Sequence, residues 1–282
     1  MKFKLTRRCF LAGCALAGVG AVADTWLVEP RWLKQTRVKV SLKTASPLAP
    51  IRILHLSDFH ESRHVPIAFI KKALELGLSH KPDLVCLTGD LINRRIEDFD
   101  QYASALALLS KSCPCYACVG NHDGGDWAHR IGGYADLGEM RRLLTGAGIS
   151  LLVNSCETVS INGTSIQIVG LGDYWAENAK PERAFPRDDL SESMPTVVLS
   201  HNPDSKKLLR DYPWDLMLCG HTHGGQLSLP LVGTPFAPVR DQRYVYGLNR
   251  WDGRWIYTTS GVGNLHGLRF NCRPEVAIIE IC

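Results

Sequence analysis

The stretch Gly120-Asn121-His122-Asp123 decides the fold, because it sets a glycine and three polar residues directly after an apolar segment. Four other polar runs follow apolar segments in the same way: Asp58-Phe59-His60, Gly89-Asp90, His201, and Gly220-His221-Thr222-His223. Each apolar segment is short and bounded by turn residues, which is typical of a buried strand. The pattern predicts a sheet that delivers polar side chains to one rim.

The residues that end these strands are hard oxygen ligands and imidazoles, with no cysteine among them. The set comprises Asp58, His60, Asp90, Asn121, His201, His221 and His223. Such ligands suit Mn, Fe, Zn or Mg better than a thiolate-bound metal. Because seven ligands exceed the four that a structural zinc takes, two cations are expected. A central carboxylate can bridge ions ~3.5–4 Å apart, and Asp90 is expected to be that bridge.

The order D-x-H, G-D, G-N-H-D, H, G-H-T-H resembles the calcineurin-like metallophosphoesterase family, over roughly Ile51 to the C-terminus. The resemblance implies an α/β fold, a four-layer α-β-β-α sandwich of two mixed sheets flanked by helices, with a dinuclear centre that hydrolyses phosphoesters. By motif, the first metal site takes Asp58, His60, Asp90 and His223. The second takes Asp90, Asn121, His201 and His221. His122 resembles the acid that protonates the leaving group, steadied by Asp123.

Phosphodiester chemistry explains these residue types. Two cations neutralise the anionic oxygens that repel a nucleophile and lower the pKa of a bound water, so that a metal-bound hydroxide attacks in line. A histidine that binds no metal can then give a proton to the leaving alkoxide. Each of these five sequence motifs, taken alone, also fits a surface turn. A non-catalytic metal-binding scaffold is the alternative class, although a scaffold has no need of His122.

Residues 1–23 form a basic, then apolar leader. Lys2, Lys4, Arg7 and Arg8 precede any acidic residue, and an uncharged run extends to Ala23. The leader resembles a twin-arginine signal, which predicts export to the periplasmic side with cleavage before Asp24. An uncleaved anchor and a lipoprotein box ending at Cys14 are the alternatives. The leader accounts for the net charge of +4, so the balanced remainder argues against nucleic acid as a partner.

Residues 24–50 form a basic segment that contains Trp26 and Trp32. Tryptophan with lysine and arginine is typical of a bilayer surface, so Trp26 to Lys34 predicts a membrane-proximal region. The alternating pattern from Arg37 to Leu42 instead favours an edge strand. The chain breaks at the proline-containing stretch 46–50 before the metallophosphoesterase domain, 51–282.

Within this domain the pattern alternates strands and helices. Helical spacing is expected over 66–80 and 99–109, with a buried strand over 84–87 between them, which predicts a parallel core. Asn162-Gly163 and Asp252-Gly253 each lie between two strand-like runs and predict tight hairpins. The later half is therefore expected to be mixed or antiparallel.

Two loops are candidates for substrate contact. Residues 124–138 follow the catalytic block and are glycine-rich, and His266 and Arg269 lie in a polar, glycine-spaced run. A solvated loop and a surface turn are the respective alternatives. Ten cysteines are a further feature, and several lie beside apolar strands where the thiol acts as a small buried hydrophobe. Many free thiols fit an exported protein poorly, which favours an anchor on the cytoplasmic face of the inner membrane as the alternative location.

The expected function is therefore metal-dependent hydrolysis of a phosphodiester or pyrophosphate at a membrane surface, with two divalent ions among Mn, Fe and Zn. The leader and the tail Gly267 to Glu275 resemble one bacterial phosphodiesterase group of the family. The alternative is a UDP-2,3-diacylglucosamine pyrophosphohydrolase of lipid A synthesis, since some relatives in the broad group have that activity.

Overall fold

The computed structural model describes residues 7, 20, 22–42, 49–185 and 194–282, in which two six-stranded sheets form the core. Most of the leader, including Lys2, Lys4 and Arg8, lies outside these residues. The first sheet has the order β1-β12-β2-β3-β4-β5. Its strands are β1 (Lys34–Val40), β2 (Ile51–Leu56), β3 (Leu84–Thr88), β4 (Cys115–Cys118), β5 (Ser150–Leu151) and β12 (Glu275–Ile281).

The second sheet has the order β10-β11-β9-β8-β7-β6. Its strands are β6 (Ser155–Ile161), β7 (Thr164–Gly170), β8 (Thr196–Leu199), β9 (Leu216–Cys219), β10 (Gly247–Trp251) and β11 (Arg254–Thr258). Both predicted hairpins are present, because β6 pairs with β7 and β10 with β11 in antiparallel fashion. Asn162-Gly163 and Asp252-Gly253 have positive φ angles, as a tight hairpin turn requires.

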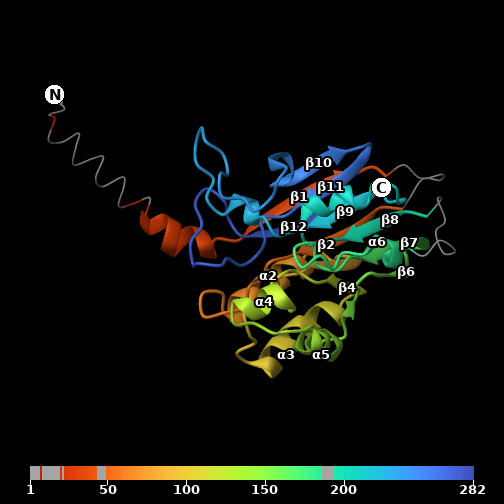
Figure 1. Cartoon of the computed structure of the whole chain (residues 1–282), viewed down its shortest axis with the longest axis horizontal. Coiled ribbons are helices and arrows are strands. Elements are labelled where there is room, and N and C mark those ends of the chain that lie inside the picture. Colours follow the sequence, from red (N-terminus) through yellow and green to blue (C-terminus); the bar gives the residue numbers. More distant parts are fainter. Residues whose placement is uncertain (1–6, 8–19, 21, 43–48, 186–193) are drawn as a thin grey trace.

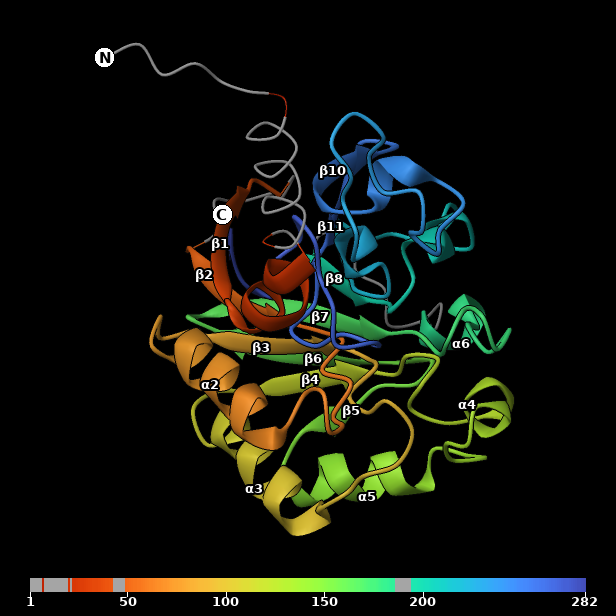
Figure 2. The same ribbon diagram turned by 90° about the vertical axis from the view of Figure 1, so that its left-hand side faces the viewer.

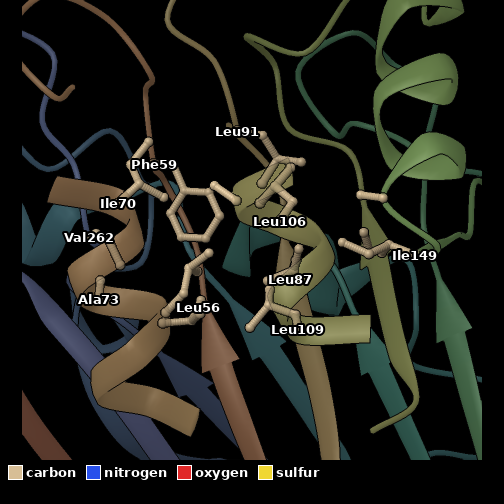
Figure 3. Close-up of a cluster of buried hydrophobic side chains, with 14 of the residues drawn as sticks. Leu56, Phe59, Ile70, Ala73, Leu87, Leu91, Leu106, Leu109, Ile149 and Val262 are labelled. Atoms are coloured by element: carbon tan, nitrogen blue, oxygen red, sulfur yellow. The ribbon is translucent and has the colours of Figure 1, made fainter. Parts of the chain in front are cut away.

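Helices cover the outer face of the first sheet (Figure 1). They are α2 (Ile67–Leu78), α3 (Phe99–Ser110), α4 (Asp126–Arg130) and α5 (Gly138–Gly146). Ile70 and Ala73 of α2, and Leu106 and Leu109 of α3, pack in one buried cluster (Figure 3). The cluster includes Leu56 and Leu87 at the ends of β2 and β3. The strand ends that carry the predicted ligands are therefore backed by close-packed apolar side chains.

A second buried cluster fills the space between the sheets, and a third covers the outer face of the second sheet. Ile53 and Val197 are typical of the inter-sheet cluster, since both are fully buried in central strands. The outer layer on the second sheet consists of short helical elements and loops. These elements are α6 (Pro181–Ala184), η3 (Pro203–Lys207) and η5 (Gln242–Tyr244). The predicted α-β-β-α sandwich of two mixed sheets is confirmed.

The N-terminal segment is joined to the C-terminal strand. β1, expected over Arg37–Leu42, spans Lys34–Val40 and pairs in parallel with β12 along its length, while β12 also pairs antiparallel with β2. The last strand of the chain thus lies inside the first sheet. Ahead of β1, two helical turns, η1 (Asp24–Val28) and η2 (Glu29–Arg31), lie at one end of the molecule (Figure 1). Among the described residues, no helix is long and apolar enough to span a bilayer.

Candidate metal centre

The seven predicted ligands lie just beyond the carboxyl ends of five parallel strands, where the two sheets share a rim. β2, β3 and β4 of the first sheet and β8 and β9 of the second carry them. All seven side chains are buried. Five have positive φ angles, which non-glycine residues rarely adopt: Asp58, His60, Asp90, His221 and His223. Strained backbone held by surrounding structure is typical of a functional site.

One group of ligand atoms gathers around Asp58, His60 and His223. His60 Nε2 lies 3.1 Å from His223 Nε2, and Asp58 Oδ1 lies 3.5 Å from the same His223 atom. Asp90 Oδ2 lies 3.5 Å from His60 Nε2 and so reaches this group from β3. The spacing suits one cation held between these atoms.

A second group comprises Asp90, His201 and His221. Asp90 Oδ2 lies 3.1 Å from His201 Nε2, so the same oxygen faces both groups, as the predicted bridge requires. Asn121 Oδ1 and His221 Nε2 are buried without a hydrogen-bond partner. Because a buried polar atom without a partner is costly, these atoms fit ligands for a divalent cation. The donor set of carboxylate, amide and imidazole also fits such ions.

Glycines allow the strand ends to approach this closely. A Cβ on Gly120 would collide with the Asp90 side chain, and one on Gly220 would collide with Ser57 and the Asp58 carboxylate. Asp58 in turn accepts hydrogen bonds from the His221 amide at 3.1 Å, which ties the two sheets together at the rim. The glycine in each motif is therefore required by contact between neighbouring strand ends.

The electrostatics of the ligands are those of an anionic site that awaits cations. Burial raises the pKa of Asp58 to about 6. Burial acts against charge at Asp90 as well, but His201 and His122 outweigh it and hold the pKa of Asp90 well below its usual range. Burial likewise opposes charge on His201, yet Asp90 raises the pKa of His201 to about 10. Asp90 and His201 therefore each favour the charged form of the other.

His122 lies among the ligands, since one of its ring nitrogens is within 4.8 Å of ligand atoms of His60 and Asp90. Its Nδ1 lies 2.7 Å from the Asn93 carbonyl oxygen, and its ring stands edge-on to that of His60 with centroids 4.6 Å apart. A carbonyl only accepts, so Nδ1 carries a proton and Nε2 remains for exchange with a substrate. Trp127 packs against the other side of the ring, at 4.4 Å between centroids.

Asp123 contacts the backbone rather than the His122 ring. Its carboxylate accepts hydrogen bonds from the amides of Gly120, Asp90 and Leu91 at 2.7–2.8 Å. The carboxylate thereby joins the loop after β3 to the loop after β4. These contacts show that Asp123 positions the ligand loops. Its predicted catalytic role, to steady His122, stays a prediction.

A pocket of about 470 Å³ opens beside the ligands. One wall carries Trp127 and Trp175, and Trp175 stands edge-on to His221 with centroids 4.2 Å apart. The predicted substrate loop 124–138 contributes Trp127 to this wall. His266 also lines the pocket, whereas Arg269 does not. The substrate contacts predicted for His266 and Arg269 stay predictions.

Arg269 is fully buried behind the metal ligands. Its guanidinium donates to the carbonyl oxygens of Ser260 at 2.7 Å and Cys272 at 2.9 Å, and to that of Gly263. The thiol of Cys272 lies 2.9 Å from the carbonyl oxygen of His223. Residues 269–272 therefore support the backbone that presents the metal ligand His223.

The N-terminal segment holds the same loop from outside. The Glu29 carboxylate is buried and accepts hydrogen bonds from the amides of Asn271 and Cys272. The carbonyl oxygen of Thr25 accepts the Arg269 amide at 3.0 Å. The segment expected to be membrane-proximal is thus bonded to the loop that supports His223.

Three features of the site were not found in the sequence. The carbonyl oxygen of Thr88 lies 2.7 Å from His201 Nδ1, and that of Asn93 orients His122, but a backbone contact has no residue-type signal. Asp173 is the third. It is buried, has one oxygen without a partner, and burial raises its pKa to about 6. The sequence signal that could have identified Asp173 as a site residue is its position shortly after the apolar strand β7.

The ligands lie together at one rim of the two-sheet sandwich, and glycines allow the strand ends that carry them to approach closely. This arrangement is that of a dinuclear-type phosphoesterase site. A family model for calcineurin-like phosphoesterases matches residues 51–225, and the chain belongs to this family of metal-dependent phosphoric ester hydrolases, which use divalent ions. Phosphodiesterase YaeI of Escherichia coli strain K12, from the bacterial group indicated by the leader and tail, is 43% identical over 98% of this chain and 99% of its own.

More distant relatives are also similar over most of their length. UDP-2,3-diacylglucosamine pyrophosphatase LpxG of Chlamydia muridarum is 30% identical, over 93% of this chain and 94% of its own. Among solved structures, that of phosphopantetheinyl hydrolase from Mycobacterium tuberculosis aligns with a TM-score of 0.49 at 14% identity, over 76% of this chain and 90% of that one.

Proposed function

We propose that this protein hydrolyses a phosphodiester or pyrophosphate bond at a membrane, with two divalent cations held by the seven rim residues. The observation that carries the proposal is the position of Asp90, whose Oδ2 faces both the His60 and the His201 sides of the site. When bound, two cations would neutralise the phosphoryl oxygens and lower the pKa of a water molecule.

His122 is the residue that completes the reaction. The leaving oxygen needs a proton, and His122 in its imidazolium form can give the one on Nε2 while the Asn93 carbonyl oxygen accepts the proton on Nδ1. Trp127 limits the movement of the ring on its other side. The proton donor and the ligand Asn121 are adjacent in the chain, so the leaving group is expected on the Trp127 side of the pocket.

The test is hydrolysis by the full chain with added manganese. Bis-p-nitrophenyl phosphate and an alkyl diester are compared for wild type, His122→Ala and the control His129→Ala, which changes an exposed histidine of the same region. We expect His122→Ala to keep its metal and to lose about 10²–10⁴-fold in rate on the alkyl diester but far less on the nitrophenyl ester, whose leaving group needs no proton. Equal losses on both substrates would remove His122 from this role.

A second candidate is cleavage of the pyrophosphate of UDP-2,3-diacylglucosamine, which the name of the Chlamydia relative supports. Phosphorus NMR on that substrate, with Asn121→Ala as the blank, separates the two functions. Turnover far above that of the artificial diester supports the lipid nucleotide and a site on the cytoplasmic face. Turnover of the artificial diester alone supports a phosphodiesterase with another substrate.

The location proposed with the first function is the periplasmic side after twin-arginine export. The leader supports it, and the identity to the Escherichia coli phosphodiesterase extends over 98% of the chain, leader included. The buried thiols Cys86, Cys115, Cys118 and Cys219, none of them in a disulfide, support the cytoplasmic alternative. Fractionation of cells that express the full chain decides between the two.

A further inference from the structure

Besides the tryptophans, the pocket beside the metal centre is lined by five further apolar side chains, four of them aliphatic, which we call the aliphatic wall. Leu227, Phe236 and Pro238 come from the loop after η4 (His223–Gly225), and Leu265 and Leu268 come from the loop before β12. Five apolar side chains next to a site for phosphate oxygens have no use in binding the phosphate itself. They suit an aliphatic portion of the same substrate.

The loop that builds this wall continues outward into exposed apolar residues. Leu231 is fully exposed, Val232 is exposed, and Phe236, which also lines the pocket, is 68% exposed. Helix η1 adds Trp26, Leu27 and Val28, all exposed. We call these six residues the apolar rim. Exposed large apolar side chains, three on each of these two segments, indicate an interaction surface.

The two parts of the apolar rim are linked through the pocket wall. Leu227 bridges to Phe270, and the Arg269 amide donates to the Thr25 carbonyl oxygen of η1. Figures 1 and 2 both show η1, in red, at the same end of the molecule as the blue loop that carries residues 264–273. Residues 269 and 270 therefore connect η1 to the loop that lines the pocket.

The half of the apolar rim on η1 is flanked by one acidic and one basic side chain. Asp24 lies in the first turn of η1, and Arg31, which follows it, is exposed. Residues 226–240 contain no acidic side chain, and the carboxylate of Glu29 is occupied by the backbone of Asn271 and Cys272. Positive charge beside apolar and tryptophan side chains complements an anionic headgroup layer. The apolar leader also enters the fold here, at Asp24.

We propose that the apolar rim lies against an anionic lipid surface and that the aliphatic wall takes a hydrocarbon chain of a phosphodiester drawn from that surface. The proposal rests on the phosphodiesterase function and adds the class of substrate and the face that meets it. The hydrocarbon chain enters between the loop after η4 and the loop before β12, and the phosphate reaches Asp90 and His122.

The first test compares methyl and dodecyl p-nitrophenyl phosphate, which share the leaving group, with the full chain and added manganese. We expect kcat/KM for the dodecyl ester to exceed that for the methyl ester by at least about 15-fold, the equivalent of two buried methylene groups at ~0.8 kcal/mol each. Equal values would overturn the aliphatic site. Hydrolysis of neither ester would instead remove the phosphodiesterase function, so the two failures are distinct.

The second test addresses the lipid surface and does not depend on activity. Leu231→Trp and the matched control Leu208→Trp, at an exposed leucine of another element, are mixed with vesicles of phosphatidylcholine and phosphatidylglycerol that contain brominated chains. Because the chain has seven tryptophans of its own, Trp26 of the apolar rim among them, the wild type is the baseline. We expect Leu231→Trp to be quenched more than the wild type and Leu208→Trp not to be. Equal quenching at both positions, or a concentration-dependent dimer that protects position 231 without quenching, would overturn the docking face.

A third measurement tests whether contact with the lipid surface affects hydrolysis of the long-chain ester. Leu231→Ser with Val232→Ser is expected to lower the rate on vesicle-borne dodecyl ester about tenfold or more, and to leave the rate on the soluble methyl ester unchanged. Leu208→Ser is the control. A double variant that equals wild type on vesicles would count against the apolar rim, and one that loses both rates equally would show damage to the fold and not to docking.

Discussion

Replacing Asp123 by asparagine tests how the buried carboxylate that joins the ligand loops is kept in place. Two opposing influences act on this carboxylate. Three backbone amides donate to it at 2.7–2.8 Å, which favours the charged form. Burial and the nearby Asp90 disfavour charge and raise the pKa of Asp123 to about 7, against an ordinary value of 3.8.

The raised pKa fixes the sign of a pH dependence in the metal-free protein. Between pH 4 and pH 7 the folded state holds a proton on Asp123 that the unfolded state has lost, so the stability that this group contributes is complete below pH 4 and falls as pH rises to 7. The slope is about 1.4 kcal/mol per pH unit, or roughly 3 kcal/mol from pH 5 to pH 7. Asp123→Asn has no proton to lose, and its stability lacks this slope.

The assay is urea unfolding of metal-free wild type and Asp123→Asn at pH 5, 6, 7 and 8. The variant keeps the amide oxygen as one acceptor and leaves one donor unpaired, at a cost of ~1–3 kcal/mol. We therefore expect the wild type to be the more stable at pH 5 and to lose that advantage by pH 7. Asp58 and His201 are present in both proteins, so the difference reports Asp123 together with its electrostatic interaction with Asp90. A difference that does not change with pH would refute the reasoning and show that the three amides outweigh burial.

The remaining predictions concern the metal, the N-terminal segment and the leader. Asp90→Ala should lose both ions by elemental analysis, and a variant that retains two per chain would exclude the bridge. Metal uptake near pH 7 should release about one proton from His201, because Asp90 outweighs burial and raises the pKa of His201 to about 10. Calorimetry in buffers of different ionisation enthalpy measures this release. A binding heat that does not depend on the buffer would contradict it. Glu29→Gln should lower the free energy of unfolding by ~2 kcal/mol, since one of two buried amides loses its acceptor; unchanged urea midpoints would count against this. Arg7→Lys with Arg8→Lys should leave the precursor in the cytoplasm, and unaltered fractionation would argue against export.

The sequence allowed the sandwich and the ligand rim to be predicted because both depend on local signals. A short apolar run that ends in a glycine and a polar residue marks the end of a buried strand, and Asn162-Gly163 marks a hairpin through its own φ preference. The gathering of the ligands followed from topology, since parallel strands end on one rim. Such signals need no knowledge of packing.

The parts that could not be predicted depend on contacts between distant segments. The contacts of the Arg269 guanidinium with the carbonyl oxygens of Ser260, Cys272 and Gly263 gave no sequence signal, because they join segments that are separated in the chain. Glu29 gave no signal because its partners are backbone amides some 240 residues away. The short helices on the outer face of the second sheet also could not be predicted, because a helix as short as α6 is too short to show a helical repeat of apolar residues.

The place of β12 in the first sheet has a consequence for the order in which the protein is made and folded. β12 lies between β1 and β2 in the sheet, so these two early strands are joined into one sheet only after β12 has been synthesised. The support of His223 by residues 269–272 is equally late. Pairing across almost the full length of the chain carries a large loop-closure cost and folds slowly. We therefore expect the backbone that presents His223 to become ordered only after residues 269–272 have joined the fold.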